Sequence, residues 1–383
     1  MNRHWDVVVV GLGGVGAAAA AELAARGLRV LGLEQFGPAH SHGSSHGRTR
    51  MIRQAYFEHP NYVPLAQASF GYWQRLQRQV GRRLFVRCGL LQVGPPQGEV
   101  LQGVRRSAGE HHLEIEDLPA EEIHRRWPGF RVPSGMAGVY EPGAGFLYVE
   151  ACVRACLEVA AGQGAQLRFC EPVQAWRVRA GEVEVRTSQE TYQAHSLVLC
   201  GGSWTGRLVP ELAPRLRVVR KPQYWFSTVD AHYRLQRGVP GFLFQLPYGV
   251  FYGFPEEHPL WGVKMAMHSG GRELAGPEEQ FPQLDREDYQ AVARFARECL
   301  PRLGRHLRAQ VPCLYTMSPD EHFVLGLHPQ GEGRVWLAAG LSGHGFKFAG
   351  VLGQALAQLV AQQETHLPVG FLDVARLWPG RSG

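Results

Sequence analysis

The chain has 383 residues, of which 45% are hydrophobic and 19% are charged, as is typical of a globular protein. This length exceeds the size at which a single hydrophobic core stops growing, so we expect two domains. The net charge is +6 and the pI is near 9.0, but the arginines are scattered rather than gathered in a long basic run. This pattern argues against a nucleic-acid partner and is compatible with an anionic small substrate.

The seven cysteines include no C-x-x-C pair, which argues against a disulfide framework and favours a reducing compartment. No secretory signal is expected, because Asp6 and a glycine turn interrupt the first apolar run. The alanine-rich run from Ala17 is broken by Glu22 and Arg26, so it is too short to span a membrane. We therefore expect a cytoplasmic protein without a membrane partner.

Residues 5–34 predict a β-α-β unit. The apolar run at 6–10 is typical of a buried parallel strand, and it leads directly into the spacing G-x-G-x-x-G at Gly11, Gly13 and Gly16. In this motif the first glycine allows a tight turn, the second allows a pyrophosphate to approach the backbone, and the third allows close helix–strand packing.

The motif is followed by an expected helix at 17–26 and an expected strand at 28–33 that ends at Glu34. A carboxylate at this position, about twenty residues after the glycines, can bind the hydroxyls of an adenosine ribose. The unit therefore predicts a dinucleotide site, and it leaves FAD and NAD(P) both open.

Further strand–glycine junctions follow the apolar runs at 196–204 and 334–340, and helices are expected at 149–164 and from residue 346. The nucleotide domain is thus assembled from separate stretches, as in many flavoprotein oxidases. We predict an α/β fold with an interleaved, Rossmann-like FAD-binding domain and a β-sheet-rich substrate domain. The expected limits are 1–85, 146–215 and 312–383 for the FAD-binding domain, and 86–145 and 216–311 for the substrate domain.

The last junction, LSGHGFKFAG, contains an unusual lysine. The chain has 37 arginines and only three lysines, Lys221, Lys264 and Lys347. Lys347 lies at the start of the expected helix, where the helix dipole disfavours a cation, so we assign it a local task such as binding a substrate carboxylate. Gly343 and Gly345 would bring the free N–H groups of that helix close to the flat ring of a cofactor.

The segment HSHGSSHGRTRMIRQAY, residues 40–56, combines three histidines with Arg48, Arg50 and Arg53. A short histidine-rich stretch can bind a metal, but no cysteine or carboxylate completes a ligand set here, and the arginines would repel a cation. We therefore expect an anion site and no metal, because guanidinium groups pair with carboxylates. Lys264, in an apolar strand, is expected to point into a site where burial alters its charge.

These motifs occur in the order found in the monomeric sarcosine oxidase and N-methyl-L-tryptophan oxidase family, which the chain resembles over nearly its whole length. The shared segments are GSSHGRTRMIRQAY, RWPGFRVP, YGFP, GVKMAMH, PCLYTMSPDEHF and LSGHGFKFAGVLG. The resemblance implies a monomeric FAD enzyme that oxidises a small N-methyl amino acid with O2. The products would be the primary amino acid, formaldehyde and hydrogen peroxide.

The resemblance also implies roles for individual residues. Cys313 would hold the flavin through a thioether to its 8α-methyl carbon, although by itself it reads as a small buried hydrophobe. Arg53 and Lys347 would bind the substrate carboxylate, and Lys264 would assist the activation of oxygen. The other residues placed in the active site by the family motifs are His46, Arg50, Tyr252, His268 and Tyr315.

Two positions depart from the family pattern G-S-H-H-G-D-T-R, since Ser45 replaces the first histidine and Arg48 replaces the aspartate. The sequence leaves the preferred N-methyl substrate open. The nearest alternative is a flavin oxidase of a cyclic secondary amino acid such as pipecolate or proline. An NAD(P)-linked dehydrogenase and a non-catalytic flavoprotein or nucleic-acid-binding module are the alternatives from other classes.

Overall fold

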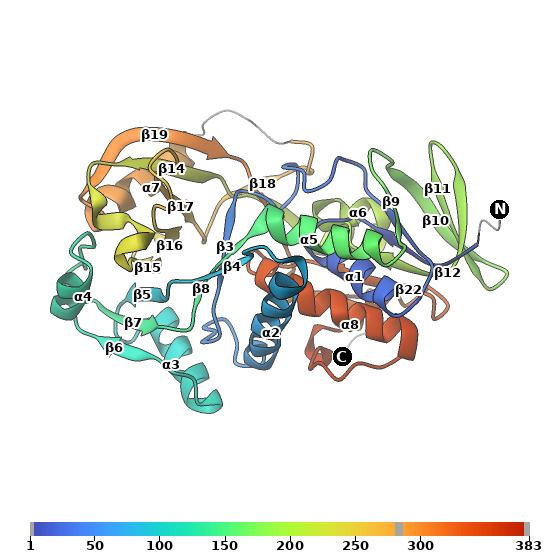
Figure 1. Ribbon diagram of the computed structural model, residues 1–383, viewed down its shortest axis with the longest axis horizontal. Coiled ribbons are helices and arrows are strands. Elements are labelled where there is room, and N and C mark those ends of the chain that lie inside the picture. Colours follow the sequence, from blue (N-terminus) through green and yellow to red (C-terminus); the bar gives the residue numbers. More distant parts are fainter. Residues whose placement is uncertain (1–3, 280–285, 379–383) are drawn as a thin grey trace.

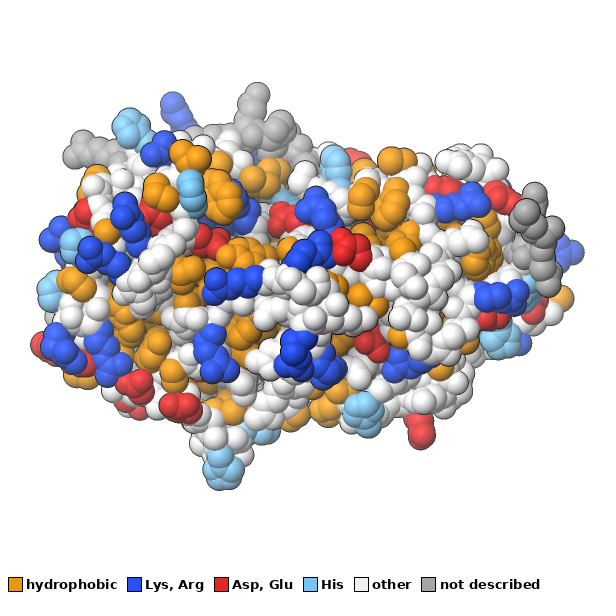
Figure 2. Space-filling model, viewed as in Figure 1, with side chains coloured by type: hydrophobic (Ala, Val, Ile, Leu, Met, Phe, Trp, Pro, Cys, Tyr) orange, Lys and Arg blue, Asp and Glu red, His pale blue; other side chains and the backbone are white. Residues whose placement is uncertain are grey.

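A computed structural model describes residues 4–279 and 286–378. Two large sheets lie at opposite ends of an elongated molecule, with helices covering the sheet that contains the N-terminal strand (Figure 1). Residues 1–3, 280–285 and 379–383, which belong to the predicted domains, lie outside the described residues. On the face drawn in Figure 2, basic side chains are spread among acidic and apolar ones.

The predicted β-α-β unit is confirmed as β1 (His4–Val10), α1 (Gly14–Ala25) and β2 (Val30–Leu33). Gly11 has φ +85°, a left-handed conformation, and a Cβ on it would lie 2.4 Å from the carbonyl oxygen of Cys200. A Cβ on Gly16 would lie 1.8 Å from the carbonyl oxygen of Gly11. The first and third glycines are therefore required by the turn and by close packing, as the motif predicts.

The first sheet joins the N-terminal unit to strands from the middle and the end of the chain. β1 pairs in parallel with both β2 and β12, and β12 pairs in parallel with β22. The added strands are β9 (Gln166–Arg168), β10 (Val173–Arg179), β11 (Glu182–Thr187), β12 (Thr191–Leu199), β21 (Val324–Leu327) and β22 (Val335–Ala339). The interleaved architecture is thus confirmed, whereas the residue limits of the domains stay a prediction.

The second large sheet is mixed and mostly antiparallel. Its spatial order is β19 (Leu303–Val311), β14 (Gln223–Thr228), β17 (Val263–Met267), β16 (Gly249–Phe254), β15 (Gly241–Leu246), β5 (Leu90–Gly94), β7 (Ala137–Glu141) and β6 (Glu116–Leu118). Phenylalanines of β15 and β16 pack against α7 (Arg286–Cys299), and their rings build a separate core. The helix α3 (Glu99–His111) contacts β5 and β7, and the helix α4 (Ala120–Arg126) contacts β7.

Two three-stranded sheets complete the fold. One contains β3 (Thr49–Ile52), β8 (Gly145–Tyr148) and β4 (Phe85–Arg87), and the other contains β18 (Arg272–Leu274), β13 (Arg217–Arg220) and β20 (Leu314–Met317). β3 forms part of the arginine-rich segment 40–56 and contains Arg50, and β20 begins directly after Cys313. These small sheets therefore carry several of the predicted site residues.

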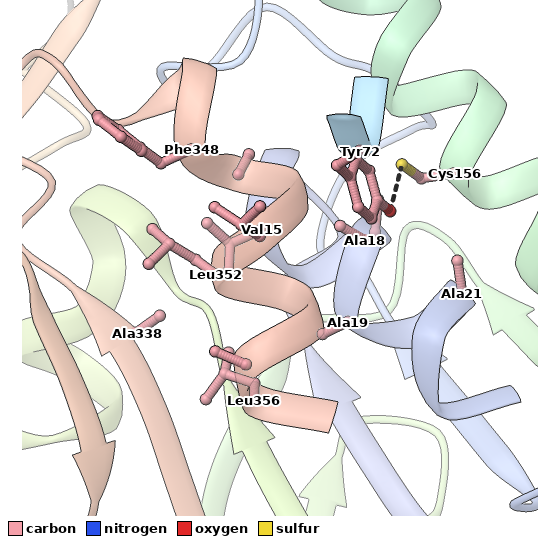
Figure 3. Packing of buried hydrophobic residues seen from close by; sticks show 14 of the residues in the cluster. Val15, Ala18, Ala19, Ala21, Tyr72, Cys156, Ala338, Phe348, Leu352 and Leu356 are labelled. Carbon is pink, nitrogen blue, oxygen red and sulfur yellow. Dashed lines mark hydrogen bonds between the residues drawn. The ribbon is translucent and has the colours of Figure 1, made fainter. Parts of the chain in front are cut away.

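The core of the nucleotide half is a stack of helices around α1. Alanines of α1, such as Ala18 and Ala19, are fully buried against α8 (Ala349–Gln362), which contributes Leu352 and Leu356 (Figure 3). The other helices here are α2 (Tyr62–Val80), α5 (Val149–Gly162) and the short α6 (Thr205–Leu208). Small side chains let α1 approach its neighbours closely, so the poly-alanine stretch is a packing surface.

Two expected boundaries differ from the structure. The strand expected at 196–204 ends at Leu199, and Gly202–Trp204 forms a 3-10 turn. The helix expected from residue 346 begins at Ala349, because Phe346–Phe348 forms a 3-10 turn of its own. Within the described residues, no helix has the length and apolar character needed to cross a membrane.

Candidate active site

An extended cavity lies between the two halves of the molecule. It is lined at one side by the carboxyl ends of β1 and β2, including Gly11 and Glu34, and at the other by Arg53, His268 and Lys347. Ligands of α/β sheets bind at the carboxyl ends of parallel strands, next to helix N-termini. The same cavity therefore contains the predicted nucleotide residues and the predicted substrate residues.

Glu34 is buried at the nucleotide end. Its two carboxylate oxygens accept the backbone N–H groups of Leu12 at 2.8 Å and Phe36 at 3.0 Å, and His40 Nε2 lies 3.4 Å away. These bonds fix the carboxylate at the end of β2 while it still lines the cavity. Its position suits the predicted contact with ribose hydroxyls.

The N-terminus of α1 also faces the cavity. Gly13 and Gly14 line it, and the N–H of Gly14 donates to Ser45 Oγ at 3.0 Å. Ser45 is one of the two departures from the family pattern, and its short hydroxyl lies at the positive end of the helix dipole. The other departure, Arg48, points away toward the ring of Trp261, and its backbone N–H donates to Glu150.

The glycines of SGHG have a structural reason independent of any ligand. Gly343 has φ +81°, and a Cβ on it would lie 2.1 Å from the ring of Tyr315. A Cβ on Gly345 would lie 2.5 Å from Leu341 Cβ. Both glycines line the cavity, as expected, but packing by itself requires their small size.

Arg50 and Cys313 meet in the middle of the cavity wall. Arg50 Nη2 donates to the carbonyl oxygen of Ser44 at 3.0 Å and to Cys313 Sγ at 3.1 Å. Cys313 is 1% exposed, yet it lines the cavity. The structure thus brings a thiol predicted to bind the cofactor into hydrogen-bonding contact with a guanidinium.

Arg53 and Lys347 lie together at the substrate end, with an acid that the sequence analysis missed. Both are buried and both line the cavity. Arg53 Nη2 donates to the two carboxylate oxygens of Glu58 at 2.7 and 2.6 Å. Burial raises the pKa of Glu58, but Arg53, His344 and Lys347 lower it to about 2. A substrate carboxylate would therefore share Arg53 with Glu58 or displace it.

Burial also governs the charge of Lys347. Its pKa is lowered to about 7, first by burial and then by Arg53, against the opposing effect of Glu58. The ammonium donates to the carbonyl oxygen of His344 at 2.7 Å. Lys347 therefore changes its charge near neutral pH, where an anionic ligand can bias it toward the ammonium form.

Tyr252, His268 and Tyr315 also line the cavity and contact one another. His268 Nδ1 lies 3.4 Å from the Tyr315 hydroxyl, and the Tyr252 and His268 ring centroids are 6.4 Å apart. Burial lowers the pKa of His268 to about 4, so the imidazole is neutral near pH 7. These residues offer rings and neutral hydrogen-bonding groups, which suit the orientation of a substrate amine.

His46 and Lys264 do not line the cavity, and neither does Gly16. His46 Nε2 bonds to the carbonyl oxygen of Gly43 at 2.9 Å, and burial lowers its pKa to about 3. Lys264 Nζ donates to the carbonyl oxygens of Gly47 and Thr49 at 2.6 and 2.7 Å. Both side chains therefore bond to the backbone of the loop that leads into β3 and carries Arg50.

Among the described residues, no group of three or more His, Cys, Asp or Glu side chains is placed to bind a metal. His42 instead stacks with Phe36 at a ring centroid distance of 4.2 Å, and the tilted ring of His40 lies 4.7 Å from that of Phe36. All seven cysteines are free thiols.

The sequence matches the model of the FAD dependent oxidoreductase family over residues 6–359. The chain belongs to this family of FAD-dependent oxidoreductases. The cavity fits that cofactor, since it joins the glycine turn and the α1 N-terminus to the region of Arg50 and Cys313. The β-α-β unit by itself left FAD and NAD(P) open, and the family match selects FAD.

Relatives of this oxidoreductase cover its whole length. It is 40% identical over 388 residues to a monomeric sarcosine oxidase of Streptomyces avermitilis, covering 98% of this chain and 99% of that protein. It is 36% identical over 375 residues to an N-methyl-L-tryptophan oxidase of Yersinia pestis, covering 97% and 99%. The resemblance expected from the motifs is therefore confirmed.

Solved structures share the fold. NikD, an amino acid oxidase of nikkomycin biosynthesis, superposes with a TM-score of 0.81 at 27% identity, covering 97% of each chain. L-proline dehydrogenase from P. horikoshii superposes with a TM-score of 0.84 at 21% identity, again covering 97% of each chain. The α/β fold of two interleaved parts is therefore that of flavin-dependent amino acid oxidoreductases.

Proposed function

We propose that this oxidoreductase demethylates an N-methyl amino acid of the sarcosine or N-methyl-L-tryptophan type. The reaction consumes the substrate, O2 and water, and it yields the primary amino acid, formaldehyde and hydrogen peroxide. The observation that carries the proposal is the pair of buried cations, Arg53 and Lys347, at the end of the cavity beyond Cys313. The named activities of two full-length relatives support it.

FAD, when bound, would supply the redox chemistry, which is the removal of a hydride equivalent and a proton from the substrate and the reduction of O2 to hydrogen peroxide by those two electrons and two protons. The protein supplies orientation. Arg53 and Lys347 bind the carboxylate, which fixes the position of the amine, and the wall of Tyr252, His268 and Tyr315 encloses it. Because its pKa is lowered, His268 presents a neutral imidazole to the substrate amine.

We call Arg53 and Lys347 the carboxylate clamp, and we test it by comparing the binding of acetate with that of its uncharged analogue acetamide. Arg53→Met or Lys347→Met should weaken acetate binding by about 2–5 kcal/mol, the usual cost of truncating one side of a buried charge pair. Acetamide binding should change little. Arg48→Met is the matched control, because Arg48 belongs to the same loop but points toward Trp261. Unchanged acetate affinity in the first two variants would refute the clamp.

Covalent attachment of FAD through Cys313 is the second part of the proposal. It is supported by the thiol's place in the cavity wall and by its bond to Arg50. The flavin of the wild-type protein should stay with the chain after acid precipitation, and Cys313→Ser should release it. Cys200→Ser is the control, since Cys200 also lines the cavity. Flavin retained by the Cys313 variant would assign the link to another residue.

Substrate choice is decided by peroxide release from sarcosine, N-methyltryptophan, N-methylalanine, pipecolate and proline. Greater turnover of pipecolate or proline would favour the alternative of a cyclic secondary amino acid. We place the enzyme in the cytoplasm as a monomer, in keeping with its seven free cysteines and with the name of its sarcosine oxidase relatives.

A further inference from the structure

Tyr56 lies behind the clamp and contacts both of its cations. It is fully buried, and it does not line the cavity. Arg53 Cζ lies 4.1 Å from the centroid of its ring, and Lys347 Nζ lies 5.0 Å from the same centroid. Cations are attracted to the face of an aromatic ring, most strongly where water is excluded. One ring therefore supports both groups that the proposed function assigns to the substrate carboxylate.

The hydroxyl of Tyr56 continues this contact into a hydrogen-bonded chain. Lys347 Nζ donates to the Tyr56 hydroxyl at 3.2 Å, and that hydroxyl lies 2.6 Å from His344 Nδ1. His344 Nε2 lies 3.1 Å from the carbonyl oxygen of Glu321. A carbonyl oxygen only accepts, so Nε2 must carry the imidazole proton.

The direction of the chain follows from the charge of His344. Burial lowers its pKa to about 3, so it is neutral near pH 7 and carries a single N–H. With that proton on Nε2, Nδ1 is an acceptor and receives the Tyr56 O–H. The phenolic oxygen then has lone pairs free for Lys347. Glu321 and His344 thus set Tyr56 as an acceptor toward the ammonium.

We infer that Tyr56 is a positioning residue that holds Arg53 and Lys347 at the spacing of one carboxylate. Its ring supports the guanidinium, and its hydroxyl orients the ammonium. This inference rests on the proposed clamp, but it goes further, because it places the specificity for an anion in a side chain that never touches the substrate.

Tyr56→Phe separates the two roles, since it keeps the ring and removes the hydroxyl. Acetate should bind the holoenzyme about tenfold more weakly, because a hydrogen bond to a charged group is lost. Acetamide should bind as before. Calorimetric titration measures both without turnover, and flavin content and the unfolding midpoint show that the variant is folded.

The pH dependence of acetate affinity distinguishes a positioning role of Tyr56 from a general packing defect, which would not shift it. The charged or titratable groups that face Lys347 are Arg53, Glu58, Arg50, Tyr56, His268 and His344. The pKa of Lys347 is about 7, so acetate affinity of the wild type should fall as pH rises through that value. Without the phenolic acceptor the ammonium is less stable, and the fall should begin at lower pH.

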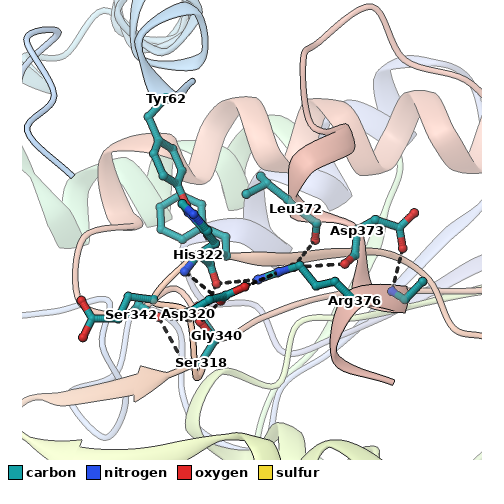
Figure 4. A network of polar contacts seen from close by, with 12 residues as sticks. Tyr62, Ser318, Asp320, His322, Gly340, Ser342, Leu372, Asp373 and Arg376 are labelled. Atoms are coloured by element: carbon teal, nitrogen blue, oxygen red, sulfur yellow. Dashed lines mark hydrogen bonds and ion pairs between the residues drawn. The ribbon is translucent and has the colours of Figure 1, made fainter. Parts of the chain in front are cut away.

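Tyr62→Phe is the matched control. Tyr62 is equally buried and its ring is 5.1 Å from that of Tyr56, but its hydroxyl bonds to His322 at 3.2 Å (Figure 4). Within the described residues, no hydrogen bond or cation–ring contact links it to Arg53 or Lys347. Its loss should lower stability and leave the pH profile of acetate binding unchanged.

The outcomes are distinct. A weaker affinity and an earlier fall with pH in Tyr56→Phe alone support the inference. Wild-type behaviour of Tyr56→Phe, or equal losses in both tyrosine variants without a shift of the profile, would overturn it while Arg53→Met and Lys347→Met still weaken acetate. If those two variants also bind acetate normally, the proposed clamp fails and the positioning role falls with it.

Discussion

All three lysines of the chain are buried and donate to backbone carbonyl groups. The acceptors are His268, Ser269 and Gly270 for Lys221, Gly47 and Thr49 for Lys264, and His344 for Lys347. An ammonium directs three donors to separate acceptors, whereas the planar guanidinium suits a single carboxylate. Each lysine is therefore a buried cation held by backbone oxygens, a task that it shares with Arg50, which donates to the carbonyl oxygens of Ser44 and Thr49.

Lys264 is the residue whose role the structure makes most testable. We propose that its ammonium stabilises the negative charge that develops on oxygen, in a region of low dielectric. Lys264→Met should then slow flavin reoxidation by about 10²-fold or more, the scale for removing one preorganised charge-stabilising group. Anaerobic reduction of the flavin by substrate should fall much less. Stopped-flow traces measure the two steps separately.

The bonds of Lys264 to the loop before β3 supply the opposing explanation. If Lys264 only holds that loop, its loss displaces Arg50 and slows reduction as much as reoxidation. Burial lowers the pKa of Lys264 well below that of a free lysine, with Arg50 as the next cause. If the Lys264 variant is reoxidised at the wild-type rate but reduced more slowly by substrate, Lys264 acts in the reductive step with the substrate and not in the reaction with oxygen.

At the scale of elements, the contact between α1 and α8 positions both the nucleotide turn and Lys347. Gly353 of α8 lies directly against α1, and a Cβ there would lie 2.6 Å from both Ala18 Cβ and the Ala19 nitrogen. The short turn Phe346–Phe348 precedes α8, and the Lys347 carbonyl oxygen accepts from Trp73 Nε1 of α2 at 2.8 Å. Movement of α8 therefore reaches the clamp directly.

Gly353→Ala should destabilise the protein by about 1–3 kcal/mol, because an added methyl overpacks a tight helix contact. Gly109→Ala is the matched control: it lies in α3, where a Cβ would meet no atom within 4 Å. That change should stabilise the protein by about 0.5–1 kcal/mol, since alanine favours the helix. Thermal unfolding compares the two, and equal effects would contradict the close α1–α8 contact.

At the scale of the whole molecule, the cavity draws its walls from segments far apart in the chain. Arg53 follows β3, Tyr252 lies in β16 of the second large sheet, and Lys347 precedes α8. A ligand that contacts these groups binds only when both halves are folded and assembled. Binding should therefore be linked to global stability.

Acetate at a hundred times its dissociation constant should stabilise the holoenzyme by about 2.7 kcal/mol. Arg53→Met should reduce this effect to about 0.9 kcal/mol or less at the same acetate concentration, given an affinity loss of about 2 kcal/mol or more, whereas Arg48→Met should retain it. The unfolding midpoint, measured with acetate and with acetamide, provides the test. Stabilisation that persists in Arg53→Met would place the acetate site elsewhere.

Much of the fold was predictable because it is encoded locally. The G-x-G-x-x-G turn, the alanine-rich helix and the apolar strands 6–10 and 334–340 all appear with boundaries close to those expected. Glycine spacing and hydrophobic periodicity act on neighbouring residues, so they are visible in the sequence itself.

The candidate site was predictable only in part. The motifs identified Arg53, Lys347 and Cys313, and the structure brings all three to one cavity. Glu58 and Tyr56 were missed, because no periodicity or spacing marks a buried acid or a supporting ring.

The sequence by itself determined the β-α-β unit, the interleaved order of the strands and the residue types available for binding an anion. Only the tertiary structure decided that Glu58 pairs with Arg53, that Lys264 bonds to a loop, and that Tyr56 lies between two cations. The physical reason is that backbone conformation depends on near neighbours, whereas the charge and direction of a buried side chain depend on burial and on every group that the fold packs around it, near or distant in sequence. Burial and then Arg53 lower the pKa of Lys347 against the opposing effect of Glu58, and that environment exists only in the folded chain.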